Sequence, residues 1–310
     1  MNESLQNTGT AFQRLDCRDP RLDRRMLRAS AMLASCQMCP RRCLANRAEG
    51  ETGECRVVDQ ILVSSWNLHH GEEPPLSGTR GSGTIFFAGC SMSCAYCQNY
   101  TISQEVEGSP VTPDKLVEIM FHLERAGAHN INFVTPTHYA AQVLKACITA
   151  RRRGLTVPFV YNTSGYDLVE TLRWFEGIVD IYLADMRYDD PAVAAEYSGV
   201  PDYPEVNKQA IAEMHRQVGL LKTDTDGIAV SGLIIRHLVL PEGLAGSAGI
   251  FSFLAREVSP RTYISLMSQY YPTHRAFQLP KIGRRITEEE YRQARKTMED
   301  AGLENGWVQG

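Results

Sequence analysis

The order of apolar and polar positions along the chain predicts alternating strands and helices from residue 83 onward. The clearest helix spans residues 112–126, where Thr112 suits the cap, Gly127 ends the helix and apolar residues recur at helical spacing. Strands separated by helices of this length predict a parallel sheet with right-handed crossovers. One strand is expected before the series at residues 61–66, and the series itself at residues 84–88, 131–135, 157–162, 179–184, 232–240 and 263–267.

The remaining helical periodicity predicts one helix near the N-terminus and several between or after the strands. In the first helix, Asp19 suits the cap and Pro20 suits the first turn. Its expected apolar stripe consists of Leu22, Met26, Leu27 and Leu33. The other helices are expected at residues 139–153, 167–175, 205–221, 245–257 and 287–301.

Strand–helix units in this number form either an open doubly wound α/β sheet or a partial α/β barrel. In both, the chemistry lies at the carboxyl ends of the strands. We expect a polar tail and helix over residues 1–35 and a cysteine-rich, metal-binding appendage over 36–80. The barrel is expected over residues 81–270, and a C-terminal loop and helix over 271–310.

The composition fits a soluble globular protein. A chain of 310 residues is long enough to bury a large core. A net charge of −4, with 43% hydrophobic and 22% charged residues, argues against disorder and against a general basic face for nucleic acid. No apolar run approaches the roughly 20 residues of a membrane span, and the N-terminus lacks the apolar segment of a signal peptide. We therefore expect a cytoplasmic protein without nucleic-acid or membrane partners.

Cysteine is the residue type that changes this picture. The chain has 9 cysteines, most of them in two groups, and a reducing compartment favours metal binding over disulfides for such groups. Cys17 and Cys147 lie outside both groups, and Cys147, on an apolar helix face, is expected to be buried.

Cys90, Cys94 and Cys97 form the group that follows the first strand of the series, with the spacing C-x3-C-x2-C. Three thiolates can hold three irons of a cubane iron–sulfur cluster and leave the fourth iron open to another ligand. The alternatives are three structural cysteines or a zinc site completed by a distant histidine.

Cys36, Cys39, Cys43 and Cys55 form the upstream group. Four thiolates suit either a fully ligated iron–sulfur cluster or an all-cysteine zinc site. Three close ligands and one remote ligand favour an auxiliary cluster mildly, because zinc knuckles usually present two close pairs. Zinc and an uncoordinated group stay open.

The C-x3-C-x2-C motif after the first strand resembles the radical S-adenosylmethionine (radical SAM) superfamily, which folds as a (β/α)6 partial barrel. The resemblance covers residues 83–267. More narrowly, the chain resembles glycyl-radical-activase-like proteins related to pyruvate formate-lyase activating enzymes, which carry an upstream CxxC-PRxC cluster. The stretches that carry this second resemblance are residues 70–75, 89–102, 134–138, 236–241 and 267–272.

This resemblance implies a [4Fe-4S] cluster on Cys90, Cys94 and Cys97 and S-adenosylmethionine (SAM) as cofactors. It implies reductive cleavage of SAM to a 5′-deoxyadenosyl radical, which takes hydrogen from a protein, peptide or small molecule. The electron would come from a reductant such as flavodoxin or ferredoxin. Two alternatives are an activase acting on a backbone glycine of a glycyl-radical enzyme, and a non-catalytic iron–sulfur or zinc protein that scaffolds a complex or transfers electrons.

The resemblance also implies SAM contacts at the strand ends. Thr135 and Thr137 stand where many relatives carry a Gly-Gly-Glu-type loop, and this chain has no acid there. Asn162 and Ser164 would reach the ribose or carboxylate of SAM. A turn with Thr137 as helix cap, and a capped tight turn after Asn162, are the structural alternatives.

Asp185 and Arg187 follow the fourth strand, where relatives commonly show Asp-x-Lys. A guanidinium can hold the SAM carboxylate through two hydrogen bonds, which an ammonium cannot. The alternative is a plain Asp–Arg pair on a loop.

Arg236 and His237 lie on the fifth strand, so only one of them can face the barrel interior. His237 is either a SAM contact or a satisfied core histidine. Met267 and Gln269, at the sixth strand, are expected to line the adenine or substrate pocket, although core packing alone would explain Met267.

The stretch before the first series strand holds His69, His70, Glu72 and Glu73. These residues suit acid–base chemistry or substrate contact, but adjacent histidines on a loop are more often surface or packing groups. Their role stays open.

Overall fold

The computed structural model describes residues 12–309, so residues 1–11 of the expected polar tail lie outside the described range. The strands are β1 Ile61–His69, β2 Ser82–Phe87, β3 Ser109–Val111, β4 Ile131–Val134, β5 Phe159–Thr163, β6 Ile181–Asp185, β7 Lys222–Thr223, β8 Ala229–Leu238, β9 Tyr263–Met267 and β10 Gly306–Val308. The helices are α1 Pro20–Ala31, α2 Pro74–Ser77, α3 Tyr100–Ser103, α4 Pro113–Arg125, α5 Ala140–Arg152, α6 Val169–Leu172, α7 Pro191–Ser198, α8 Tyr203–Val218, α9 Ser247–Phe253 and α10 Glu288–Asp300.

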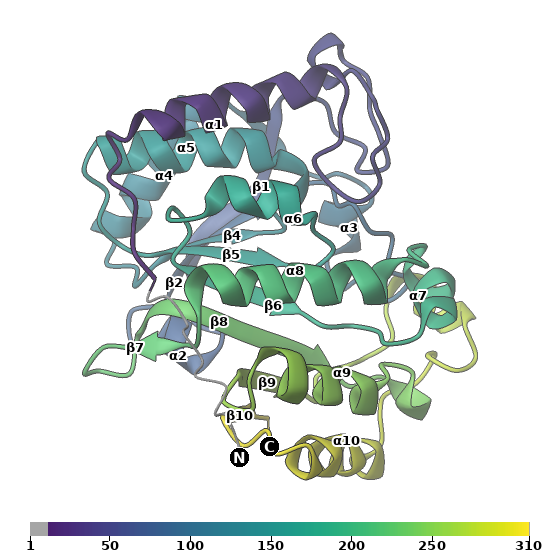
Figure 1. Cartoon of the computed structure of the whole chain (residues 1–310). Coiled ribbons are helices and arrows are strands. Elements are labelled where there is room, and N and C mark those ends of the chain that lie inside the picture. The colour runs from purple at the N-terminus through teal and green to yellow at the C-terminus, as the bar shows by residue number, and fades with distance from the viewer. Residues whose placement is uncertain (1–11, 310) are drawn as a thin grey trace, which may run out of the picture.

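The main sheet has the strand order β10-β9-β8-β6-β5-β4-β2-β1-β3. Strands β2, β4, β5, β6, β8 and β9 are parallel neighbours, and β10 extends them in parallel at one edge. At the other edge β1 pairs antiparallel with β2, and β3 pairs antiparallel with β1. This path does not close on itself, so the expected partial barrel is confirmed. Figure 1 shows α1 lying over α5, and α9 and α10 at the opposite end of the molecule.

Local capping explains where the expected helices begin. The Asp19 carboxylate accepts a hydrogen bond from the Arg21 amide at the start of α1, and the Thr112 hydroxyl accepts one from the Lys115 amide at the start of α4. The apolar stripe expected on the first helix is wrong at Leu27, which is 72% exposed. The face that packs on α5 runs through positions 22, 26, 29 and 33, so position 27 falls just outside it.

Several elements differ from the expected ones. The strand expected at residues 157–162 begins only at Phe159, because Pro158 has no N–H for a sheet ladder. The helix expected at 245–257 ends at Phe253 and continues as a π-helical turn. Helices α3 and α7 and strand β10 were not expected, and β10 pairs with β9 over the C-terminal Trp307. Cys147 is fully buried on α5, as expected.

Alternation along the strands separates an outer from an inner face. On β8, Leu233 and Ile235 pack in the large cluster that includes α4, α5 and α8, whereas Ile234 packs with Leu76 of α2 in a separate inner cluster. Arg236 is therefore on the inner face with Ile234, and His237 is on the outer face with Ile235. The inner positions are the ones available to a ligand.

Candidate active site

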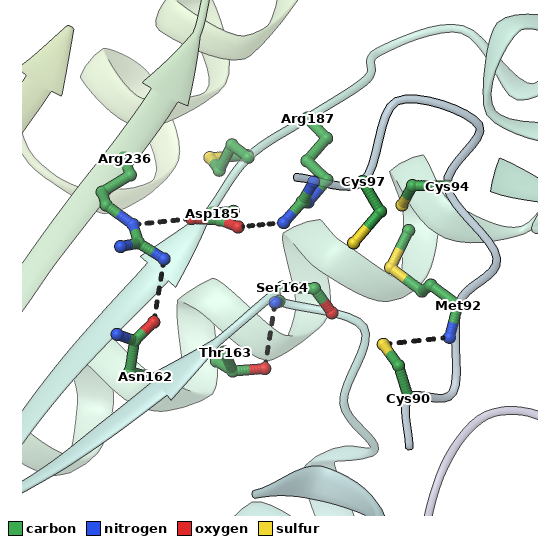
Figure 2. A network of polar contacts seen from close by, with 12 residues as sticks. Cys90, Met92, Cys94, Cys97, Asn162, Thr163, Ser164, Asp185, Arg187 and Arg236 are labelled. Atoms are coloured by element: carbon green, nitrogen blue, oxygen red, sulfur yellow. Dashed lines mark hydrogen bonds and ion pairs between the residues drawn. The ribbon is translucent and has the colours of Figure 1, made fainter. Parts of the chain in front are cut away.

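The loop after β2 carries the three cysteines of the C-x3-C-x2-C motif at the carboxyl edge of the sheet. Figure 2 shows Cys90, Cys94 and Cys97 on this loop, with the Arg187 side chain directed toward it. Cys94 is buried, and the other two are partly exposed. Burial raises the pKa of the Cys90 thiol to about 12, so without metal it stays protonated at neutral pH.

Hydrogen-bonding groups surround the sulfur atoms of this loop. The Ser198 hydroxyl, at the end of α7, donates to Cys94 Sγ over 3.0 Å, and the Ser103 hydroxyl lies 3.1 Å from Cys97 Sγ. The Met92 amide lies 3.4 Å from Cys90 Sγ. Such contacts tune metal–thiolate centres. Sequence reasoning missed both serines, because neither belongs to the motif and Ser198 lies over 100 residues away in the chain.

Asp185 lies between two arginines at the end of β6 (Figure 2). Its Oδ1 accepts from Arg236 Nε at 2.8 Å and its Oδ2 from Arg187 Nη2 at 2.5 Å. Burial alone would raise the pKa of Asp185, but the two guanidinium groups outweigh burial and hold it below its ordinary value. The Asn162 side-chain oxygen accepts from Arg236 Nη2 at 2.8 Å. The structure thus brings Asn162, Asp185 and Arg187 together through Arg236.

A cavity of about 190 Å³ lies between this network and the cysteine loop. Cys97, Arg187, Arg236, Met267 and Gln269 are among its lining residues. A second cavity of about 660 Å³ lies between α9 and α10, and none of the expected site residues lines it. The smaller cavity is the candidate active site, because it joins a motif cysteine to the charged strand ends.

Thr135 and Thr137, after β4, have different roles in the structure. Thr135 has a φ of 58°, a left-handed conformation that is unusual for a β-branched residue and is typical of constrained sites. The Thr137 hydroxyl is buried and donates to Asp167 Oδ1 at 2.8 Å. Asp167 also accepts from Thr163 and Tyr161 and so joins the ends of β4 and β5. The sequence carried no spacing signal for this buried carboxylate.

The remaining expected contacts, Ser164 and His237, are not among the residues that line the cavity. Ser164 lies in the turn after β5, and its carbonyl accepts from the Tyr203 hydroxyl at 2.8 Å. His237 is fully buried on the outer face of β8, where its ring nitrogens lie 2.8 Å from the Met186 carbonyl and from Ser247 Oγ. The structure therefore does not bring His237 to the cavity, and it satisfies both ring nitrogens as expected for a core histidine.

The upstream cysteines share one buried region. Burial raises the pKa of the Cys39 thiol to about 12, and the thiols of Cys55, Cys36 and Cys43 are near enough to add to that rise. The backbone around them is unusually constrained. The non-glycine residues with left-handed φ between 12 and 309 include Arg42, Leu44 and Arg56, which neighbour the cysteines of this group.

The upstream segment, residues 36–60 before β1, is docked on the motif loop. Arg41 Nε donates to the Ser91 carbonyl at 2.9 Å, and Arg41 Nη1 donates to the Gly199 carbonyl at 2.8 Å. Arg56 donates to the Gln104 carbonyl, and the Gln104 side chain donates to the Cys94 carbonyl at 2.9 Å. Together these contacts join the upstream segment to the motif loop and to the elements packed around it.

Gly89 shows how close this contact is. It has a φ of +85°, and a Cβ at this position would lie 2.7 Å from the Cys55 carbonyl oxygen and from Val57 Cγ1. Only glycine fits both the backbone conformation and the space. The two cysteine groups thus meet at the residue that precedes Cys90.

Within residues 12–309, no three His, Cys, Asp or Glu side chains converge on the position of a single metal ion. A cubane cluster does not require such convergence, since each thiolate binds a different iron. The thiols and their hydrogen-bond donors are consistent with a cluster of this kind on the motif loop.

A parallel, open α/β barrel with three cysteines after its first strand and a polar cavity at the strand ends defines a radical SAM type of protein. In agreement, residues 84–217 match the profile of the Radical SAM superfamily. A relative in Methanocaldococcus jannaschii, "Uncharacterized protein MJ0674", is 32% identical over 293 residues, which cover 91% of this chain and 80% of the relative. The chain belongs to the radical SAM superfamily, whose members are enzymes that use a [4Fe-4S] cluster and SAM.

Other matches are weaker. "Uncharacterized protein MJ0808" of the same organism is 28% identical over 155 residues, 44% of this chain and 45% of that protein. A domain of a pyruvate-formate lyase-activating enzyme from Bacteroides vulgatus is 18% identical, with a TM-score of 0.36 over 64% of this chain and 91% of that one. HydG, a maturase of the [FeFe]-hydrogenase, is 10% identical, with a TM-score of 0.49 over 71% of this chain and 48% of that one. Separately, no helix in the described part of the chain is both long and apolar enough for a membrane span.

Proposed function

We propose that this protein is a radical SAM enzyme that cleaves SAM at a [4Fe-4S] cluster on Cys90, Cys94 and Cys97 and removes a hydrogen atom from an organic substrate. The observation that carries the proposal is the cavity of about 190 Å³ in which Cys97 faces Arg187 and the strand ends. When bound, the cluster and SAM supply one-electron cleavage of a carbon–sulfur bond and a carbon radical that takes hydrogen from substrate. The chain supplies binding, orientation and exclusion of water.

Arg187 is the residue best suited to hold the SAM carboxylate. It shares one Nη atom with Asp185, while its Nε is buried without a partner in the described chain. A buried donor without a partner is costly, and an incoming carboxylate would satisfy it. Asp185 and Arg236 in turn hold the guanidinium in place, because they form one chain of ion pairs across the strand ends.

The upstream cysteines are proposed to hold a second metal centre, either a second iron–sulfur cluster or zinc. The cluster fits better, because a zinc ion needs its ligands to converge on one position and no three do so within residues 12–309. Four thiols, left-handed backbone around them and contact with the motif loop support such a centre. A cluster in this place would pass electrons toward the motif loop, whereas zinc would hold the docked segment together. Metal analysis of a variant in which Cys90, Cys94 and Cys97 are all replaced by alanine separates the two, because iron and sulfide above background then require a second cluster and stoichiometric zinc excludes it.

The test of the enzymatic proposal is formation of 5′-deoxyadenosine from SAM by anaerobically reconstituted, dithionite-reduced protein. Wild type is expected to form it, and Cys97→Ala is expected to form none. If cleavage waits for substrate, wild type still binds SAM, so a SAM titration accompanies the assay. Full iron loading without SAM binding or cleavage would contradict the proposal and favour a scaffold or electron-transfer protein.

Arg187→Met is expected to weaken SAM binding by about 1–3 kcal/mol, the value of a charged hydrogen bond. Arg187→Lys retains the charge but not the paired donors, so it is expected to recover only part of the loss. Arg285, which lies over the Tyr271 ring and does not line the cavity, offers a control as Arg285→Met. Equal SAM affinity in wild type and Arg187→Met would make the Asp185–Arg187 pair structural only.

A further inference from the structure

The inner face of the barrel holds two acidic residues that the proposed chemistry does not use. Glu72 and Glu73 follow β1 and immediately precede α2. Their backbone is fixed by that short helix, because the Glu73 carbonyl accepts from the amides of Leu76 and Ser77 at 2.8 and 3.1 Å. Glu73 occupies the N-cap position of α2, yet its side chain makes no capping hydrogen bond. The carboxylate is therefore directed elsewhere.

Both carboxylates are withdrawn from solvent. The side chain of Glu72 is 8% exposed and Glu73 is 3% exposed. Glu73 Oε2 has no hydrogen-bond partner among the described residues. Glu72 Oε2 lies 3.7 Å from Arg236 Nη1, which is longer than a hydrogen bond. Arg236 in turn lines the active-site cavity, so the acidic pair lies directly behind its wall.

Charge and hydrogen bonding are both incomplete around this pair. Three carboxylates, those of Asp185, Glu73 and Glu72, lie around the Arg236 guanidinium. Among the residues that the structure describes, the only other positive charge paired with them is that of Arg187, which binds Asp185. Three carboxylates therefore face two guanidinium groups. Burial raises the pKa of Glu72 to about 7, with Arg236 opposing that rise and Glu73 and Asp185 adding to it. A cation bound beside Glu72 would therefore favour release of the Glu72 proton near neutral pH.

Two neutral side chains on the same inner face also lack partners. Asn132, on β4, is fully buried beside Glu72 and helps to lower the pKa of that carboxyl, but by distance and angle neither its oxygen nor its nitrogen completes a hydrogen bond within residues 12–309. Ser265, on β9, is the register partner of Arg236, and its buried hydroxyl is also unpaired. Buried polar atoms without partners are rare in native proteins, and several together point to a missing ligand.

We propose that Glu72 and Glu73, with Asn132, anchor an ammonium or guanidinium group of the substrate. This rests on the proposed function and narrows its substrate class to organic cations with N–H donors. Such a group brings several donors to acceptors that have none, and it balances the excess carboxylate. A divalent metal ion suits the site less, because the Arg236 guanidinium 3.7 Å from Glu72 would repel a double charge more strongly. The anchor would fix which carbon of the substrate lies next to the cavity.

The experiment uses reconstituted protein with SAM and three small probes of similar size: n-butylammonium, n-butylguanidinium and neutral 1-butanol. Mg²⁺ and Ca²⁺ are tested alongside them as metal-ion probes. Binding is followed by the shift in Tm and by titration calorimetry. The heats measured in buffers of different ionisation enthalpy give the number of protons released on binding. We expect at least one of the two cations to bind, 1-butanol not to bind, and proton release near pH 7. Which cation binds more tightly distinguishes an amine from a guanidine substrate.

The variant Glu73→Gln keeps the shape of the side chain and removes its charge. We expect cation binding at least tenfold weaker, unchanged SAM affinity, and a Tm equal to or above that of wild type, because a buried carboxylate without a partner is lost. Glu299→Gln, on the exposed face of α10, is the control and should change none of these.

Four results would overturn the anchor: no binding of either organic cation, equal binding of 1-butanol and the cations, preferential binding of Mg²⁺ or Ca²⁺, or a Tm lowered by Glu73→Gln. The last would mean that Glu73 has a structural role. Wild-type protein that binds the cations but neither binds nor cleaves SAM would leave the anchor standing and contradict the proposed enzymatic function instead. The two failures are therefore distinguishable.

Discussion

The two cysteine groups of this protein are built differently although they touch. Cys97 of the motif loop lines a cavity with charged strand ends, and side chains from α3 and α7 contact the sulfur atoms of Cys94 and Cys97. Cys36, Cys39 and Cys55 of the upstream segment are buried, and none of them lines the active-site cavity. The motif loop takes its position from the sheet, whereas the upstream segment has little regular structure beyond a short 3₁₀ turn at 47–49.

This difference separates an open site from a closed one. A site with an accessible thiol and a charged cavity has room for a second ligand, as catalytic metal centres do. A segment with buried thiols and left-handed backbone beside them depends on whatever holds those thiols together. The following predictions test that division, beginning with the largest expected effect.

Replacing one cysteine in each group should have opposite consequences. Cys97→Ala is expected to abolish SAM cleavage while the fold and the upstream metal remain. Cys55→Ala is expected to remove the upstream metal and to lower Tm, because metal ligation no longer links Cys55 to the other cysteines of the upstream segment. Metal content, Tm and 5′-deoxyadenosine formation measure the two effects, with Cys17→Ala, outside both groups, as control. A lower Tm in Cys97→Ala but not in Cys55→Ala would contradict the division into an open motif-loop site and a metal-dependent upstream segment.

Gly89→Ala tests the contact between the groups. The new Cβ would lie 2.7 Å from the Cys55 carbonyl oxygen, in addition to the cost of a left-handed alanine, so we expect a loss of about 2–4 kcal/mol of unfolding free energy. Gly50→Ala is the matched control, since Gly50 has a φ of +87° but nothing within 4 Å of the added carbon. It should cost about 1 kcal/mol. Equal losses in denaturant unfolding would show that the upstream segment does not press on the motif loop.

Arg41→Gln removes the guanidinium group whose hydrogen bonds hold the upstream segment on the motif loop. Arg41 donates hydrogen bonds to the Ser91 and Gly199 carbonyls, so the substitution is expected to lower the unfolding free energy by about 1–3 kcal/mol. Its neighbour provides the control. Arg42 lies 3.9 Å from Glu170 in an exposed pair, so Arg42→Gln should cost at most about 0.5 kcal/mol. Denaturant unfolding of the metal-loaded proteins measures both, and equal costs would remove the docking role of Arg41.

Ser198→Ala should produce the smallest effect, and only at the motif loop. Its hydroxyl donates to Cys94 Sγ over 3.0 Å, and such a donor stabilises the more negative, reduced state of a cluster. We therefore expect a lower reduction potential in an anaerobic redox titration followed by electron paramagnetic resonance. Ser93→Ala, on the same loop, is the control, because Ser93 contacts Ser198 through its backbone amide. A potential that stays constant or rises would contradict the expected hydrogen bond.

Local features of the sequence were sufficient for much of the fold and for grouping the cysteines that are proposed to bind metal. Strand and helix periods are local, so the six parallel strands and the caps at Asp19 and Thr112 could be predicted. Ligand spacing on one loop is also local, which is why the spacing alone groups Cys90, Cys94 and Cys97 into one proposed site. The error at Leu27 arose because the exposed face of α1 begins one position away from its buried face.

Contacts between distant segments could only be decided by the tertiary structure. The sequence restricted the inner face to one of Arg236 and His237, and packing of His237 against α9 selected Arg236. Asp167, Ser198 and the pair Glu72 and Glu73 acquire their surroundings from strands and helices far away in the chain. The number of thiols and their spacing were thus written in the sequence, while the charges and hydrogen bonds around them depend on how the barrel brings its strand ends together. Electrostatic surroundings depend on distance in space, and a linear pattern contains that distance only for near neighbours.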